Sequence, residues 1–146
     1  MSDDIHIEKI KELAKQFRMA IESTDMNERP KSFKKFPQGS CGDTCEMLGA
    51  YYIDHGLGKF EYIMAERGDA HSYQSHGWLL QGSIIVDITA DQFNEGVGKI
   101  IVSENSKWHN NTWTTKPDPR IADFRNDHIA NNNLHTFYQR IISKIN

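Results

Sequence analysis

"SHGWLLQGSIIVDIT", residues Ser75 to Thr89, contains two strand-like runs that meet at Gly82. Both runs are short and rich in aromatic or β-branched residues, a composition typical of strands. A two-residue turn fits at either Gln81-Gly82 or Gly82-Ser83, and both are tight turns of the kind that join antiparallel strands. The sequence therefore predicts a β-hairpin over these residues.

The hairpin brings a histidine and an aspartate together. With the Gln81-Gly82 turn, His76 lies directly opposite Asp87. With the Gly82-Ser83 turn, Asp87 faces Trp78, and His76 is its diagonal neighbour on the same face. A three-residue turn would send Asp87 to the other face. A carboxylate within the apolar run "IIVDIT" needs a partner, either an imidazole N–H or, on an edge strand, water.

The rest of the chain alternates between helical and strand-like spacing. Apolar residues at helical intervals predict helices over residues 2–23, from about residue 40 to the stop at Gly56, and over residues 128–144. "FEYIMAE" and "KIIVSE" predict two further strands. "NSKWHNNTWTTKPDPR" is polar and interrupted by prolines, so we expect a loop. These elements predict one α+β domain over residues 1–146, with an antiparallel sheet and helices at both ends.

Both cysteines lie at the start of the second predicted helix. Ser40 and Asp43 form an S-x-x-D pattern that predicts a capping box, which makes Cys41 the first helical residue. There, unpaired backbone N–H groups and the helix dipole favour a thiolate. Cys45 follows one turn later on the apolar face and is expected in the core. The sequence thus favours Cys41 as a reactive thiol.

Two segments resemble a known superfamily. "GSCGDTCEMLGAYYIDHGL" is similar to the nucleophile helix of transglutaminase-like and papain-like thiol enzymes, and "SHGWLLQGSIIVDITADQF" resembles their His strand followed by their Asp strand. The resemblance implies a papain/transglutaminase-like core with a Cys41-His76-Asp87 triad. It covers about residues 36–93. "QGSCGDTC" also resembles the papain-type nucleophile segment, which nominates Cys45 as the alternative nucleophile.

Under this resemblance we expect a thiol-dependent acyl-transfer enzyme. His76 would take the proton of Cys41, and Asp87 would orient the imidazole while the thiolate attacks an amide or acyl carbonyl. The Cys41 N–H and the Gln38 side chain are the expected oxyanion donors, and Trp78 could line the pocket. The triad does not choose between water and an amine as acceptor, so peptidase, deamidase and transglutaminase-type reactions stay open.

Composition excludes several other classes of function. The net charge of −3 and the short basic cluster at residues 29–35 argue against nucleic-acid binding. No apolar run is long enough to span a bilayer, and the acidic start "MSDDIHIEKI" does not look like a signal peptide, so we expect a cytoplasmic protein. We see no cofactor motif.

Two other readings compete with the enzyme. Cys41, Cys45, His71 and His76 have spacings compatible with a structural zinc site. A catalytically silent binding domain is also compatible with the sequence, with "KWHNNTWTT" as an exposed aromatic contact loop.

Overall fold

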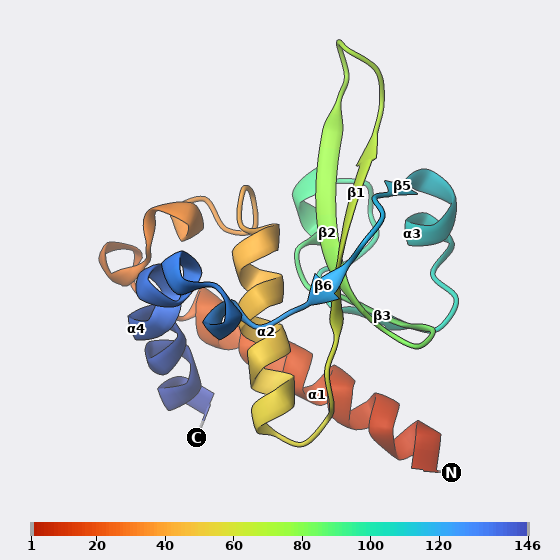
Figure 1. Cartoon of the computed structure of the whole chain (residues 1–146). Coiled ribbons are helices and arrows are strands. Elements are labelled where there is room, and N and C mark those ends of the chain that lie inside the picture. The colour runs from red at the N-terminus through yellow and green to blue at the C-terminus, as the bar shows by residue number, and fades with distance from the viewer. Residues whose placement is uncertain (1, 146) are drawn as a thin grey trace.

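The fold combines helices with an antiparallel sheet, as the computed structural model, which describes residues 2–145, shows (Figure 1). Within these residues the helices are α1 (Ser2–Glu22), α2 (Cys41–Asp54), α3 (Lys107–Thr112) and α4 (His128–Ile145). The strands are β1 (Glu61–Arg67), β2 (Gln74–Gln81), β3 (Ile84–Asp87), β4 (Ile101–Ser103), β5 (Thr114–Thr115) and β6 (Arg120–Ile121). Short 3₁₀ turns occur at Met26–Glu28, Lys31–Phe33, Ala90–Phe93 and Phe124–Asn126.

The strands lie in the order β4-β3-β2-β1-β5, and β6 also pairs with β1. Gln81 pairs with Ile84, so the hairpin turn is Gly82-Ser83. Gly82 has φ +60, which glycine adopts without the steric penalty of a side chain. The structure therefore selects the second of the two predicted turns, and the same register extended by one pair sets Asp87 opposite Trp78.

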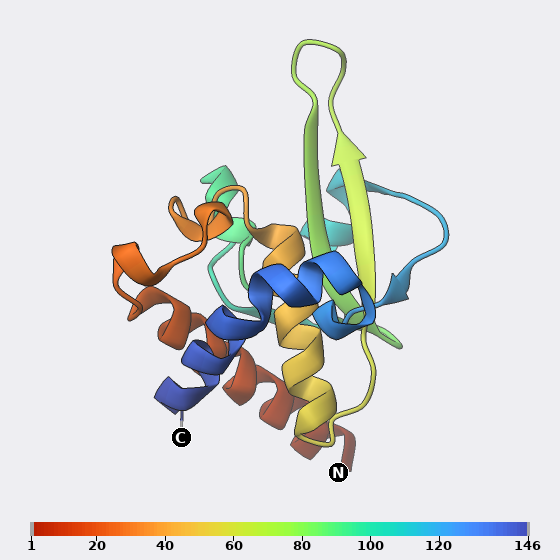
Figure 2. The ribbon, with the colours of Figure 1, turned by 60° about the vertical axis from the view of Figure 1, so that its left-hand side comes forward.

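The two faces of the sheet contact different elements. On one face, Tyr62, Leu79 and Val86 join the main core formed with α1, α2 and α4. On the other face, Ile63, Trp78 and Ile85 form a second cluster with Trp113, which follows α3. Figures 1 and 2 show the three long helices gathered on one side of the sheet and α3 on the other.

The β1–β2 hairpin is much longer than the strand beside it. β1 and β2 pair over seven residues, whereas β3 pairs with β2 only at Leu79, Leu80 and Gln81. The hairpin consequently projects from the body of the molecule (Figure 2). His76 lies on the part of β2 that extends beyond the last β3 pair, so the segment after β3 can pack beside it.

The predicted helices and four of the strands are confirmed, but the predicted loop at residues 105–120 is wrong. That stretch contains α3 and β5 and begins β6. Its apolar positions are too few to show a period, and its structure comes from packing of its aromatic side chains against the sheet. Among the described residues, no helix is long and apolar enough to cross a membrane.

Candidate active site

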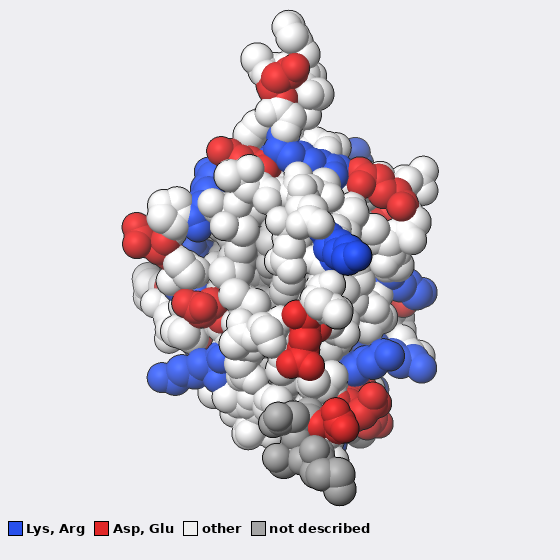
Figure 3. Space-filling model, turned by 90° about the vertical axis from the view of Figure 1, so that its right-hand side faces the viewer, with Lys and Arg blue, Asp and Glu red and all other residues white. Residues whose placement is uncertain are grey.

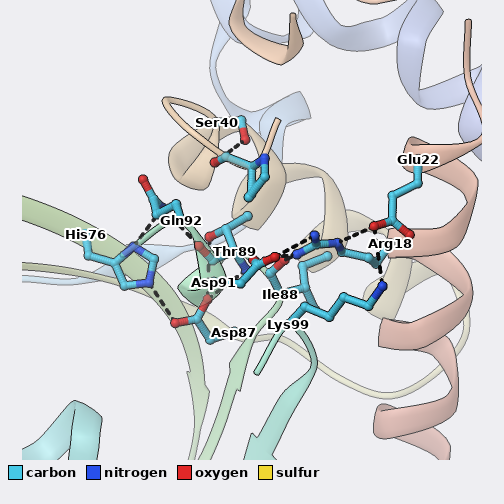
Figure 4. Close-up of polar contacts among 11 residues, drawn as sticks. Arg18, Glu22, Ser40, His76, Asp87, Ile88, Thr89, Asp91, Gln92 and Lys99 are labelled. Carbon is cyan, nitrogen blue, oxygen red and sulfur yellow. Dashed lines mark hydrogen bonds and ion pairs between the residues drawn. The ribbon is translucent and has the colours of Figure 1, made fainter. Parts of the chain in front are cut away.

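Asp87 and His76 form a buried hydrogen-bonded pair. His76 Nε2 lies 2.7 Å from Asp87 Oδ2, and both side chains are almost completely enclosed. Asp87 ends β3, and His76 projects from the neighbouring strand β2 on the same face (Figure 4). The hairpin register therefore produces the His-Asp pairing that the sequence predicts.

A second histidine, His109, bonds to the same carboxylate oxygen. Its Nε2 lies 2.7 Å from Asp87 Oδ2, and its side chain is also fully buried. Its Nδ1 is 2.6 Å from Ser106 Oγ, which in turn accepts the backbone N–H of His109 at the start of α3. A serine O–H that donates to Nδ1 leaves the proton of a neutral imidazole on Nε2, where it can bond to Asp87.

The carboxylate of Asp87 is stabilised in its ionised form. Its second oxygen, Oδ1, accepts the backbone N–H of Thr89 at 3.0 Å. Burial raises the pKa of Asp87, but the hydrogen bonds from His109 and His76 outweigh burial and lower the pKa to about 2. Asp87 is therefore a fixed negative charge at neutral pH.

His76 is held as an imidazolium. Burial lowers its pKa, but the hydrogen bond to Asp87 and the proximity of Cys41 outweigh burial and raise the pKa to about 9. With Nε2 on Asp87, Nδ1 is the nitrogen available to the sulfur. The amide nitrogen of Gln92, on the 3₁₀ turn after β3, lies 3.4 Å from that Nδ1 and 3.1 Å from the Thr89 carbonyl oxygen (Figure 4).

Cys41 and Cys45 lie in different environments, although they are one helical turn apart. Cys41 is partly exposed at the first residue of α2, and Cys45 is buried. Burial raises the pKa of the Cys45 thiol well above its ordinary value, so Cys45 is a poor nucleophile. Of the two thiols, Cys41 is the one that combines exposure with an interaction with His76.

Ser40 occupies the N-cap position of α2, but the predicted capping box is wrong. The Ser40 hydroxyl donates to the Pro37 carbonyl oxygen at 3.0 Å, and Asp43 accepts a bond from Ser32. No side chain in the described residues caps the helix. The cis peptide bond between Phe36 and Pro37 lies in the turn that places Ser40. The first N–H groups of α2 are thus left free of a side-chain acceptor beside Cys41.

Aromatic rings enclose the imidazole of His76. The ring centroids of Phe93, Trp113 and Trp78 lie 5.0, 5.6 and 5.8 Å from that of His76. Arg67 covers this cluster, with its guanidinium carbon 4.3 Å from the centre of the Trp113 ring. These rings exclude water from the His-Asp pair, which strengthens its electrostatic interaction.

The N-terminal helix fixes the segment that follows Asp87. Arg18, buried on α1, donates to both carboxylate oxygens of Asp91 at 2.7 and 2.8 Å and to the Ile88 carbonyl oxygen at 2.7 Å (Figure 4). Its guanidinium carbon also lies 4.8 Å from the centre of the Phe36 ring. Arg18 thereby connects the chain leading to Cys41 with the chain that carries Gln92.

Two other predicted residues have different surroundings from those expected. Gln38 is exposed in the turn before α2, and the structure gives its side chain no contact with the site. Trp78 is buried, and its ring packs at 4.6 Å from that of His109, so it belongs to the packing around the network.

The two competing readings also meet obstacles. His71 is exposed in the turn between β1 and β2, while Cys45 is buried in α2, and the described residues hold no cluster of the two cysteines with His71. The segment "KWHNNTWTT" is not an exposed loop, because His109 and Trp113 are buried against the sheet.

His76, Asp87 and His109 are also metal-ligand types, and their ligand atoms lie within 4.8 Å of one another. No other such group of three occurs in the described residues. Both 2.7 Å contacts fit N–H···O bonds to one oxygen, and ligands on a common metal do not bond to each other in this way. The geometry is that of a proton-linked network.

Sequence reasoning missed His109 and Gln92. His109 lies in the segment interpreted as a loop, 22 residues after Asp87, and no local pattern links the two. Gln92 had a weak signal, since "TADQF" directly follows the Asp87 strand and a turn there returns the chain toward the neighbouring strand.

A hollow of about 1040 Å³ lies along α1, lined by residues such as Ile5, Glu8 and Met19, away from the His-Asp pair. Almost all of the residues that line this hollow belong to one open side of α1, and none belongs to the His-Asp pair. On the face in Figure 3, acidic and basic side chains are interspersed, with no continuous patch of one sign.

We compared the chain with models of known protein families, with curated proteins and with solved structures. None of the three comparisons found a match.

Proposed function

We propose that this chain is a thiol-dependent acyl-transfer enzyme with Cys41 as nucleophile, His76 as acid and base, and Asp87 as the orienting carboxylate. The observation that carries the proposal is the buried 2.7 Å bond from His76 Nε2 to Asp87, together with a partly exposed Cys41 at the start of α2 whose proximity raises the pKa of the same imidazole. The proposal includes a papain/transglutaminase-like arrangement of the core, in which a helix N-terminus presents the thiol to a histidine on the sheet.

The reaction would proceed in two halves. The Cys41 thiolate attacks an amide or acyl carbonyl carbon, a C–S bond forms, and the C–N or C–O bond breaks as imidazolium His76 gives its proton to the leaving group. Neutral His76 then takes a proton from water or an amine, which attacks the thioester and releases the thiolate. Asp87 stays ionised and holds the imidazole in one tautomer throughout.

The substrate is an amide or acyl compound, with a peptide or a protein side chain as the class we propose first. Water as acceptor gives hydrolysis or deamidation, and an amine gives transglutamination. We propose no nucleic-acid partner, because the charge is mixed over the sequence and on the face shown in Figure 3. We propose a cytoplasmic location, in which both cysteines stay reduced.

The test is alkylation of the folded protein with limiting iodoacetamide across a pH series, with each cysteine followed by peptide mass spectrometry. We expect Cys41 to be alkylated faster than a free cysteine at the same pH, and Cys45 to react far more slowly. His76→Ala should remove the fast phase, while His135→Ala, which changes an exposed histidine on α4, should not.

Three outcomes would contradict the proposal. If Cys41 reacts no faster than a free thiol, a non-catalytic binding domain remains. Fast reaction at Cys45 would place the nucleophile one turn further along α2. If the purified protein carries one equivalent of a divalent metal, and removing it disrupts the fold, the group His76, Asp87 and His109 is a metal centre.

A further inference from the structure

Two glycines next to the candidate catalytic residues make room for one tyrosine side chain. Gly42 follows Cys41, and Gly77 follows His76. A Cβ atom at Gly77 would lie only 2.5 Å from Cε1 and 2.6 Å from the hydroxyl oxygen of Tyr62. A Cβ atom at Gly42 would lie 3.2 Å from the same hydroxyl oxygen. The Tyr62 ring therefore crosses Gly77, and its hydroxyl lies at the first turn of α2.

The Tyr62 hydroxyl is available to a ligand. It takes part in no hydrogen bond within residues 2–145, although most of the side chain is buried. It is not among the enclosed unpartnered atoms of the described chain, which are Thr44 Oγ1 and Trp113 Nε1, so solvent still reaches it. The ring also borders a hollow of about 110 Å³ formed with Met64 and residues 116–120.

Burial, followed by the proximity of Cys45 and Cys41, raises the pKa of Tyr62. The phenol therefore keeps its proton at neutral pH and can donate a hydrogen bond. A neutral O–H donor beside a nucleophile at a helix N-terminus is one of the arrangements that stabilise a developing oxyanion. The sequence had nominated Gln38 for this role, but Gln38 is exposed in the turn before α2.

We infer that the Tyr62 hydroxyl, set between Gly42 and Gly77, is the side-chain donor of the oxyanion site and acts with the backbone N–H of Cys41. This inference rests on the proposed thiol-enzyme function. When the Cys41 sulfur adds to the carbonyl carbon, the carbonyl oxygen gains the electron pair of the C=O π bond. The Tyr62 O–H donates to that oxygen and keeps its own proton.

Two reagents separate this role from nucleophilicity. Acylation of Cys41 by p-nitrophenyl acetate passes through an oxyanion, whereas alkylation by iodoacetamide displaces iodide and forms none. We expect Tyr62→Phe to leave the alkylation rate of Cys41 within about twofold of wild type. The same change should lower the acylation rate by about tenfold or more, because removal of one oxyanion donor can slow catalysis by about 100- to 1000-fold.

Tyr73→Phe is the matched control. It removes a tyrosine hydroxyl from the same hairpin, where the hydroxyl bonds to Glu66, and both rates should stay unchanged. Gly77→Ala keeps the phenol but forces the ring to move, so it should also lower acylation relative to alkylation. If Tyr62→Phe acylates as fast as wild type while Cys41 alkylates rapidly in both, the Tyr62 inference is wrong and the proposed nucleophile stands. If wild-type Cys41 alkylates like a free thiol, the proposed function fails as well.

Discussion

The two faces of the sheet bury different chemistry. The face toward α1, α2 and α4 is predominantly apolar, with Leu79 and Val86 at most 1% exposed. The opposite face encloses Asp87 and two imidazoles within a cluster of aromatic rings that Arg67 covers. Along β2 the two environments alternate from residue to residue, because successive side chains of a strand point to opposite faces.

This difference separates the main apolar core from the buried His-Asp charges, whereas Cys41 and Tyr62 belong to the face toward the helices. Burial of apolar surface supplies the main favourable term in folding, about 25 cal/mol for each Å² removed from water. A buried ionised network adds little net stability, because the loss of hydration offsets its internal attraction. The face toward the helices therefore supplies most of the stability, and the face with the His-Asp pair supplies little. Buried groups with shifted pKa values of this kind are typical of functional sites.

The largest expected effect on stability follows removal of the shared carboxylate. Asp87→Ala leaves two buried imidazoles without their acceptor, so we expect the free energy of unfolding to fall by about 3–5 kcal/mol. Urea unfolding at pH 7 measures this loss. Asp25→Ala, which removes an exposed carboxylate, should change stability by less than about 0.5 kcal/mol. A loss at Asp87 of under about 1 kcal/mol would contradict the buried, doubly bonded geometry.

A substitution on the helix face should separate the two properties. Leu79→Ala creates a cavity in the main core, and we expect the free energy of unfolding to fall by about 2–5 kcal/mol. The alkylation rate of Cys41 under native conditions should stay within about twofold of wild type, because the His-Asp pair lies on the other face, Cys41 is partly exposed at the first residue of α2, and alkylation does not use the hydroxyl of Tyr62, which packs beside Leu79. If Leu79→Ala slows alkylation as strongly as His76→Ala does, the two faces are coupled and the separation is wrong.

The sequence predicted the face toward α1, α2 and α4 better than the face that buries Asp87 and its two histidines, for a physical reason. Apolar periodicity is local, so α1, α2 and α4 and the strands of the hairpin could be located from spacing alone. The pairing of His76 with Asp87 was also predictable, because a tight turn fixes the register over a few residues. His109 reaches Asp87 through the packing of Trp113 and Trp78, which is set by tertiary contacts between distant segments.

Removal of His109 tests the part of the network that the sequence did not reveal. His109→Phe deletes one donor to Asp87 Oδ2, and we expect a loss of about 1.5–3 kcal/mol, as for a hydrogen bond to a charged group. The pKa of Asp87 should rise, because a bond to its ionised form is gone. Urea unfolding at pH 7 measures the loss in each variant. His109→Gln keeps an N–H donor and should lose less. Equal losses for the two variants would assign His109 to ring packing alone.

The smallest expected change is a shift in the titration of His76. Its pKa is raised from 6.5 to about 9, so the stability that it contributes is fully present below pH 6.5 and is lost as the pH rises through about 9. Two-bond ¹H–¹⁵N spectra across this range should show the imidazole midpoint near 9 in the wild type. Cys41→Ser should lower the midpoint, because the interaction with the sulfur favours the imidazolium. An unchanged midpoint would mean that Asp87 alone stabilises the imidazolium of His76 and that the thiol is not paired with His76. In that case the polar face would be a structural His-Asp-His cluster, and the proposed catalytic role would lose its main support.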